Sequence, residues 1–129
     1  MATTIISCSL LLSQNYLVSD IPQELKRNAN TVIRDYTTEM IIKQINDLNY
    51  KVKEVKTILN KSGERNAAVV LHYDKDVKYS GIKVKVINEF GKVIETYSRK
   101  DFQDINGTGS SGLYTDNRVL VLEVTSATF

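Results

Sequence analysis

The residues best suited to covalent chemistry in this sequence are one thiol and one imidazole. Cys8 lies in an apolar run near the N-terminus, and His72 follows the aliphatic pair Val70 and Leu71. A nucleophilic site needs a thiol or hydroxyl, a base within hydrogen-bond reach and a group that orients the base. No pattern in the sequence joins Cys8 and His72 in this way, and an imidazole on a strand is most often a surface or half-buried residue. We therefore expect this chain to carry no catalytic residues.

A metal site would have to use oxygen ligands, because the chain has one His and one Cys. Residues 104–107 (Asp-Ile-Asn-Gly) resemble part of a calcium loop. However, Phe102 stands where the first ligand belongs, and Leu113 stands where the closing acidic residue belongs. The acidic pair Asp74 and Asp76 is typical of a solvated turn. We expect neither a metal nor a cofactor.

Aromatic side chains are the remaining candidates for contact with a ligand. Their faces can stack on sugars or peptides, although tyrosine is also a common strand residue. The residues that would form such a contact surface are Tyr73, Tyr79, Tyr97, Phe102 and Tyr114. They motivate one hypothesis for the function, a cell-surface module that binds glycan or peptide.

Composition limits the class of protein. The 129 residues are 42% apolar and 25% charged, which is ordinary for one globular domain with a core. The 17 basic and 15 acidic residues leave a net charge of +2, and the two signs are mixed along the chain. This pattern does not predict a nucleic-acid surface. A single cysteine excludes an intramolecular disulfide.

The first fourteen residues have a different character from the rest. Their apolar run, residues 5–12, has the size of a signal-peptide core and is too short to span a bilayer. The basic residues that usually begin a signal peptide are missing, because no Lys or Arg precedes Lys26. We expect residues 1–14 to be the remnant of a signal peptide and the protein to be exported to the periplasm or cell surface. Two alternatives stay open: a lipoprotein anchored through Cys8, and a buried N-terminal strand in which Cys8 is inert.

A central hairpin organises the predicted fold. Residues 82–86 alternate aliphatic side chains with lysines, which is the period of a strand with one buried face. Asn88 and Gly91 bracket a four-residue turn, because Asn can bond the backbone two residues on and Gly can adopt a positive φ. A second strand follows the turn up to Tyr97.

Other segments are predicted to be strands with two short helical pieces. A short helix begins near Pro22, with Ser19 or Asp20 as its cap. The β-branched residues 31–45 change phase, which predicts a long strand with a bulge near residues 36–39, although a helix over residues 39–45 competes. A turn at residues 46–49 leads to a strand that ends at a second Asn-x-x-Gly turn, Asn60 to Gly63. Residues 98–105 contain a helical turn.

Two apolar runs, residues 67–71 and 118–124, are predicted to be strands buried on both faces. Together the elements predict a mostly β protein, an antiparallel β-sandwich built from hairpins.

Several blocks of the sequence resemble a known family. The blocks are residues 19–25 (SDIPQEL), 28–34 (NANTVIR), 57–63 (TILNKSG), 72–75 (HYDK) and 113–119 (LYTDNRV). In their order and spacing they resemble the DUF3857 family, a β-sandwich domain found N-terminal to transglutaminase-like domains in exported proteins of Bacteroidetes and related bacteria. The resemblance implies that residues 15–129 form one such domain, incomplete at its C-terminal side.

The family implies no catalytic residues in this domain, because any Cys, His and Asp site would lie further downstream. The preferred function is then a non-catalytic accessory or interaction domain of an exported transglutaminase-like protein. Its expected partners are the downstream transglutaminase-like domain and other envelope proteins or glycan, with no nucleic acid and no transmembrane segment. Glycan or peptide binding at the cell surface stays as the alternative.

Overall fold

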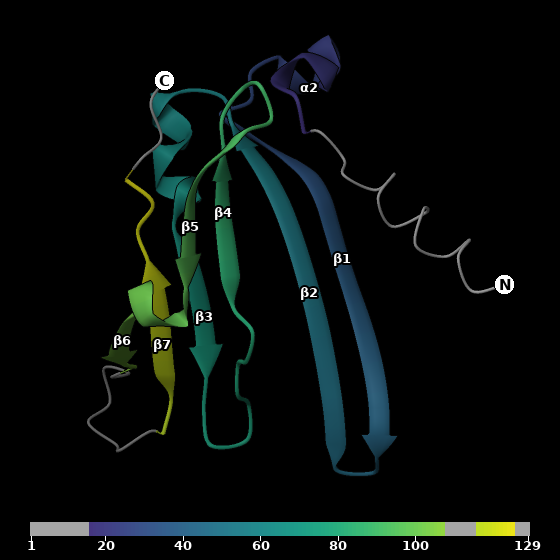
Figure 1. Ribbon diagram of the computed structural model, residues 1–129, viewed down its shortest axis with the longest axis vertical. Coiled ribbons are helices and arrows are strands. Elements are labelled where there is room, and N and C mark those ends of the chain that lie inside the picture. The colour runs from purple at the N-terminus through teal and green to yellow at the C-terminus, as the bar shows by residue number, and fades with distance from the viewer. Residues whose placement is uncertain (1–15, 108–115, 126–129) are drawn as a thin grey trace, which may run out of the picture.

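The structure is a computed structural model that describes residues 16–107 and 116–125. Over these residues the chain is mostly antiparallel β-structure, as predicted. The elements are η1 (Val18–Asp20), α2 (Gln23–Lys26), β1 (Thr31–Gln44), β2 (Asp47–Ile58), η2 (Lys61–Ala67), β3 (Val69–Tyr73), β4 (Lys83–Ile87), β5 (Val93–Ser98), η3 (Arg99–Asp101), β6 (Gln103–Asn106) and β7 (Arg118–Leu122). They form a three-stranded sheet, β3-β7-β6, and two hairpins, β1-β2 and β4-β5 (Figure 1).

The core lies between the three-stranded sheet and the β4-β5 hairpin. Its buried residues are Phe102, Leu120 and Leu122, with relative exposures of 8%, 1% and 3%. Half-buried side chains of both layers pack against them: Val69, Leu71, Tyr73, Ile82, Val84, Tyr97 and Val124. Because β7 is the middle strand and alternates, Leu120 and Leu122 share the face that meets the hairpin. Two packed β layers are the arrangement of a β-sandwich.

The β4-β5 hairpin agrees with the prediction. The Asn88 side chain accepts hydrogen bonds from the backbone N–H groups of Phe90 and Lys92, at 3.1 and 2.9 Å. Gly91 has a φ of 81°, which favours glycine because a side chain is strained there. The turn sets the register that pairs Val84 with Tyr97 on the core side.

The β1-β2 hairpin is longer and differs in detail from the prediction. The register shifts between Ile33 and Asp35, so the bulge lies at Arg34 and not at residues 36–39. The connection is the two-residue turn Ile45-Asn46. The competing helix over residues 39–45 is wrong, because residues 39–42 and 44 pair with β2. Only the base of this hairpin is buried, where Val32 is 8% exposed.

Two helix starts differ from the prediction. Asn60 does not make a hairpin turn; it caps η2, and its side chain accepts a hydrogen bond from the Gly63 N–H at 3.2 Å. In an Asn-x-x-Gly sequence, the Asn side chain can accept this backbone hydrogen bond both in a turn and at the start of a helix. Near the N-terminus, neither Ser19 nor Asp20 caps α2, whose N-cap position is Pro22.

Two predictions, one about the extent of an element and one about burial, need correction. The helical turn expected over residues 98–105 is the short η3, closed by a capping box between Ser98 and Asp101. The residues after Phe102 form β6, because their backbone pairs with β7. The strand at residues 67–71 was expected to be buried on both faces, yet Val70 on β3 is 49% exposed.

Candidate interaction surface

The register of the β1-β2 hairpin separates its side chains into two faces. In an antiparallel pair, residues directly opposite each other lie on the same face. The pairs Thr38–Val52, Met40–Tyr50 and Ile42–Leu48 therefore share one face. The same face continues toward the base with Tyr36–Glu54 and, beyond the bulge, Ile33–Lys56. We call this set the apolar hairpin face: Ile33, Tyr36, Thr38, Met40, Ile42, Leu48, Tyr50, Val52, Glu54 and Lys56.

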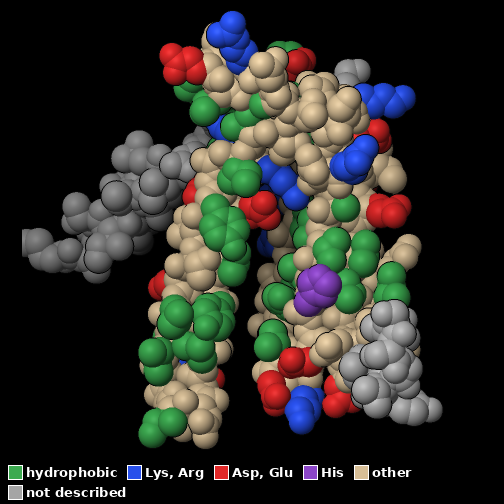
Figure 2. Space-filling view, turned by 180° about the vertical axis from the view of Figure 1, so that it is seen from behind, with side chains coloured by type: hydrophobic (Ala, Val, Ile, Leu, Met, Phe, Trp, Pro, Cys, Tyr) green, Lys and Arg blue, Asp and Glu red, His purple; other side chains and the backbone are tan. Residues whose placement is uncertain are grey.

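The apolar hairpin face is open to solvent. Its seven large apolar side chains have exposures between 44% at Leu48 and 71% at Ile42. Seen from behind, hydrophobic side chains gather along the hairpin, with no part of the sheet body over them (Figure 2). Isolated exposed apolar residues are ordinary, whereas a contiguous row of them marks an interaction site. Tyr and Met, which this face contains, are enriched at the centres of protein interfaces.

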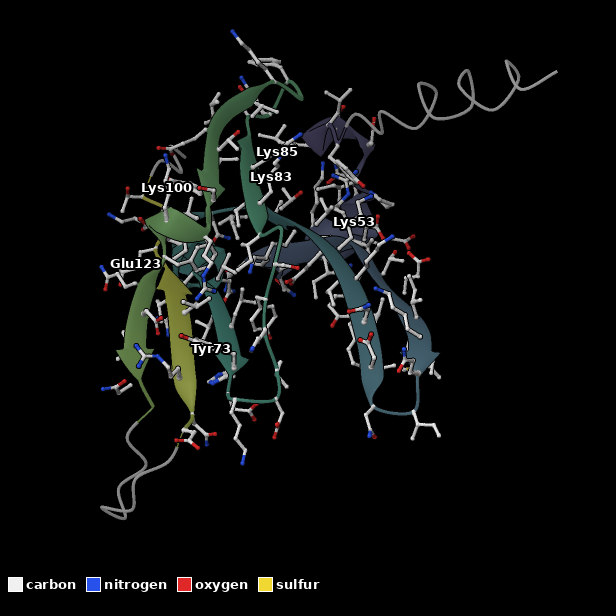
Figure 3. All side chains as sticks on the ribbon, turned by 60° about the horizontal axis from the view of Figure 1, so that its bottom comes forward. Lys53, Tyr73, Lys83, Lys85, Lys100 and Glu123 are labelled. Carbon is white, nitrogen blue, oxygen red and sulfur yellow. The ribbon has the colours of Figure 1, made fainter. Side chains whose placement is uncertain are left out.

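The opposite face of the same hairpin is polar and internally bonded. The Lys53 ammonium contacts an Asp35 carboxylate oxygen at 2.7 Å and the Tyr16 hydroxyl at 2.9 Å. The Thr37 hydroxyl donates to the other Asp35 oxygen at 2.8 Å. Further along, Lys51 and Glu39 form an ion pair of 3.6 Å. Lys53 lies on β2 (Figure 3). The hairpin therefore has one apolar face and one polar face.

These contacts change the protonation of the pair at the centre of the polar face. Hydrogen bonds from Lys53 and Thr37 hold the pKa of Asp35 below the usual range of an aspartate. The hydrogen bond to Asp35, followed by the one to Tyr16, raises the pKa of Lys53 to about 12. Both groups are therefore charged near neutral pH, and this face is suited to water.

A second polar cluster lies on the three-stranded sheet. The Tyr73 hydroxyl donates to Asp104 at 2.6 Å, and the Arg118 Nε donates to Tyr73 and Asp104, each at 3.0 Å. These bonds lower the pKa of Asp104, with Tyr73 as the largest cause, and raise the pKa of Arg118. The Arg99 guanidinium lies 5.6 Å from the centre of the Tyr73 ring. Figure 3 marks Tyr73 at this sheet.

An open hollow adjoins this cluster. Its volume is about 350 Å³, and its lining residues are Tyr73, Asp74, Lys75, Asn106, Asp116 and Arg118. The lining carries both signs of charge. Groups of three or more metal-ligating His, Cys, Asp or Glu side chains are absent from the part of the chain that the structure describes.

The predicted aromatic residues are not gathered on one exposed surface. Phe102 is a core residue at 8% exposure, and Tyr97 and Tyr73 pack against that core. A buried Phe102 presents no face to a ligand. Tyr79 is half-buried in the segment between β3 and β4. Tyr114 lies outside the described residues.

The structure describes only one of the two residues with reactive side chains. His72 is exposed on β3, opposite Val119 of β7, and is visible on the sheet surface in Figure 2. Cys8 lies outside the described residues, as does the whole segment 1–14. Among residues 16–107 and 116–125, no helix is long and apolar enough to cross a membrane.

Sequence reasoning did not identify the apolar hairpin face. The signal was the alternation of Leu48, Tyr50 and Val52, matched by Tyr36, Met40 and Ile42 on the other strand. This alternation predicts one apolar face but does not tell what covers it.

Comparison with protein-family models assigns most of the chain. The model described as a domain of unknown function with solved structure, DUF3857, matches residues 45–129. The match runs from the turn of the β1-β2 hairpin through β7 and so includes the core. Searches of curated proteins and of solved structures find no match. The order of the sequence blocks, the two β layers and this match agree, and the chain belongs to the DUF3857 family.

Proposed function

We propose that this chain is a non-catalytic interaction domain, which holds a protein partner through the apolar hairpin face. The observation that supports this function is the contrast between the two faces of one hairpin. Seven large apolar side chains are exposed on one face, while the other carries the bonded Asp35–Lys53 pair. Solvation alone does not require such a separation. Covering the apolar side chains would contribute about 25 cal/mol for each Å² removed from water.

The proposed setting is an exported protein with a transglutaminase-like domain. The support is the resemblance of the sequence blocks to domains that precede such enzymes, together with membership of DUF3857. In this setting the domain positions a companion domain and takes no part in its chemistry. The apolar run at residues 5–12 supports export to the periplasm or cell surface.

A matched pair of variants tests the proposed binding surface. Ile42 and Ile41 are neighbours of the same type, but Ile42 pairs with Leu48 on the apolar face and Ile41 pairs with Asn49 on the polar face. The chain is titrated calorimetrically with the transglutaminase-like region encoded by the same gene. We expect Ile42→Lys to weaken binding at least tenfold and Ile41→Lys to change it little. Equal effects of the two variants would contradict the surface.

The non-catalytic part of the proposal has its own test. The chain alone is incubated with peptide amide and acyl-transfer substrates, and product formation is measured by mass spectrometry. We expect no turnover above the rate in buffer. Turnover that is lost in Cys8→Ser or His72→Ala would contradict the proposal.

Glycan or peptide binding is the second candidate, and the hollow beside Tyr73 favours it. Tyrosine, carboxylate, amide and guanidinium groups converge there, and such groups fix the orientation of polar ligands. A glycan and peptide array tests this candidate. Binding that Arg118→Ala abolishes would support it, and no binding above background would remove it.

A further inference from the structure

We propose that the partner of the apolar hairpin face is the same face of a second copy of this chain, packed with the two hairpin tips pointing in opposite directions. This inference rests on the proposed function and names a second copy, in place of the companion domain, as the occupant of the face. The contact is isologous: the same residues are used twice about a two-fold axis. It places two two-stranded layers face to face, as in a small β-sandwich.

The charge of the face suits contact with itself. From base to tip the face has five levels, each formed by one pair of opposite residues. The three levels nearest the tip carry no charged side chain. The two charges, Glu54 and Lys56, have opposite signs and lie in the two levels nearest the base. Two copies therefore meet without like charges facing each other across the centre, which would cost several kcal/mol.

The sizes of the side chains also match under this symmetry. The middle level is Thr38–Val52, the pair with the smallest side chains, and larger side chains lie on both sides of it. A two-fold axis at this level places Tyr36 of one copy against Met40 of the other. It also places the Glu54 carboxylate against the Tyr50 hydroxyl of the other copy, where it can accept a hydrogen bond. The only charged side chain next to the centre thus gains a polar partner.

The area of the face is sufficient for a dimer. From their exposed fractions, the seven apolar residues expose on the order of 800 Å² together, and a standard interface buries about 800 Å² per partner. In the view of Figure 2, no described part of the molecule covers the hydrophobic side chains of the hairpin. Two layers about 10 Å apart fill the space between them with the side chains of both copies.

Sedimentation equilibrium of the full chain tests the association. We expect a concentration-dependent mass that reaches twice that of the chain. Ile42→Lys is expected to weaken dimerisation at least tenfold, and Ile41→Lys to leave it near the wild-type value. Ile42 is 71% exposed, so lysine is tolerated there, and circular dichroism melting checks that both variants fold.

Cross-linking tests the position of the two-fold axis. In a Cys8→Ser background, Thr38→Cys places one thiol of each copy at the axis, and Glu39→Cys places it on the opposite face. A short bis-maleimide is expected to join the Thr38→Cys chains at least tenfold more efficiently than the Glu39→Cys chains. Equal cross-linking of the two variants would overturn the arrangement.

The outcomes separate this inference from the proposed function. A chain that stays monomeric at several hundred micromolar overturns the second copy as partner. If Ile42→Lys still weakens binding to the transglutaminase-like region in that case, the interaction function stands with a different occupant. A dimer that Ile42→Lys does not weaken overturns the face as its interface. If Ile42→Lys affects neither association, the proposed function fails as well.

Discussion

The two hairpins of this domain follow the same local pattern and have different surroundings. In β4-β5, the opposite residues Val84 and Tyr97 both pack against the core. In β1-β2, the opposite residues Met40 and Tyr50 are each 56% exposed. Period-2 alternation therefore specifies that a hairpin has an apolar face, and the rest of the chain decides whether that face is covered.

This difference separates stability from interaction. Apolar side chains in and beneath β4-β5 leave water on folding, so they contribute to the free energy of unfolding. Side chains on the apolar hairpin face stay in contact with water in the single chain. They are expected to contribute to association and little to folding.

The largest expected effect is at the core that β4-β5 covers. Leu120 is 1% exposed, so Leu120→Ala removes packed methyl groups and leaves a cavity. We expect a loss of about 2–5 kcal/mol in the free energy of unfolding, measured by urea denaturation. Ile42→Ala is the matched change in the other hairpin and is expected to cost less than about 1 kcal/mol. Similar losses would abolish the distinction between the hairpins.

The next effect concerns the turn of β4-β5. Gly91 has a φ of 81°, where a β-branched side chain is strained. Gly91→Val is expected to lower the unfolding free energy by roughly 1–3 kcal/mol. Gly91→Asn should recover part of this loss, because Asn tolerates positive φ better than Val. If the Asn and Val variants have the same thermal midpoint, the positive φ of Gly91 is not the source of the loss.

A smaller effect is expected from pH, on the polar face of β1-β2. The pKa of Asp35 is lowered by Lys53, so the ionised form is favoured by folding. The stability from this group is present at neutral pH and is lost as the pH falls through the lowered pKa. The pKa of Lys53 is about 12, so its contribution is lost only as the pH rises through that value.

Asp35→Asn is therefore expected to reduce the loss of stability on acidification, measured as urea midpoints from neutral pH to below pH 4. Asp104→Asn serves as the matched variant on the sheet, because its carboxyl pKa is also lowered. An unchanged acid profile in Asp35→Asn would show that the Lys53 contact is not retained in solution.

The smallest effect on stability is expected from truncation of Tyr50, an exposed aromatic residue of the β1-β2 hairpin. Tyr50→Ala is expected to change the thermal stability of the dilute chain by no more than about 0.5 kcal/mol. The same variant should weaken the association of two copies. A large loss of stability in dilute solution would show that Tyr50 is covered within the single chain.

Local chemistry in the sequence was enough to predict much of the fold. The alternation of residues 82–86 and the Asn88 to Gly91 turn specify a hairpin, and the structure has it there. The bulge was predicted a few residues too late in the sequence. A change of phase between Ile33 and Tyr36 is compatible with a bulge at any of several residues, and the sequence does not distinguish them. Asn60 was misassigned because a turn and a helix cap use the same hydrogen bond.

Elements that depend on distant partners were not predictable in this way. Strand β6 has no apolar alternation, and it exists because its backbone pairs with β7. The exposure of the apolar hairpin face likewise depends on what the rest of the chain leaves uncovered. The bonded cluster of Tyr73, Asp104 and Arg118 joins residues up to 45 apart in the sequence, so no local motif marks it.

Oxidation of Met40 tests the central claim most directly, namely that the long hairpin presents its apolar face to another molecule. Met40 is 56% exposed, and a brief pulse of hydroxyl radical converts accessible methionine to the sulfoxide. Peptide mass spectrometry measures the oxidation rate of Met40 over a range of chain concentrations. Oxidation of the core residue Phe102 serves as the buried reference. We predict fast oxidation in dilute solution and a several-fold slower rate where the chain dimerises. A rate that is slow even at the lowest concentration would contradict an exposed apolar hairpin face, and a rate that does not change with concentration would contradict a second copy as the partner of that face.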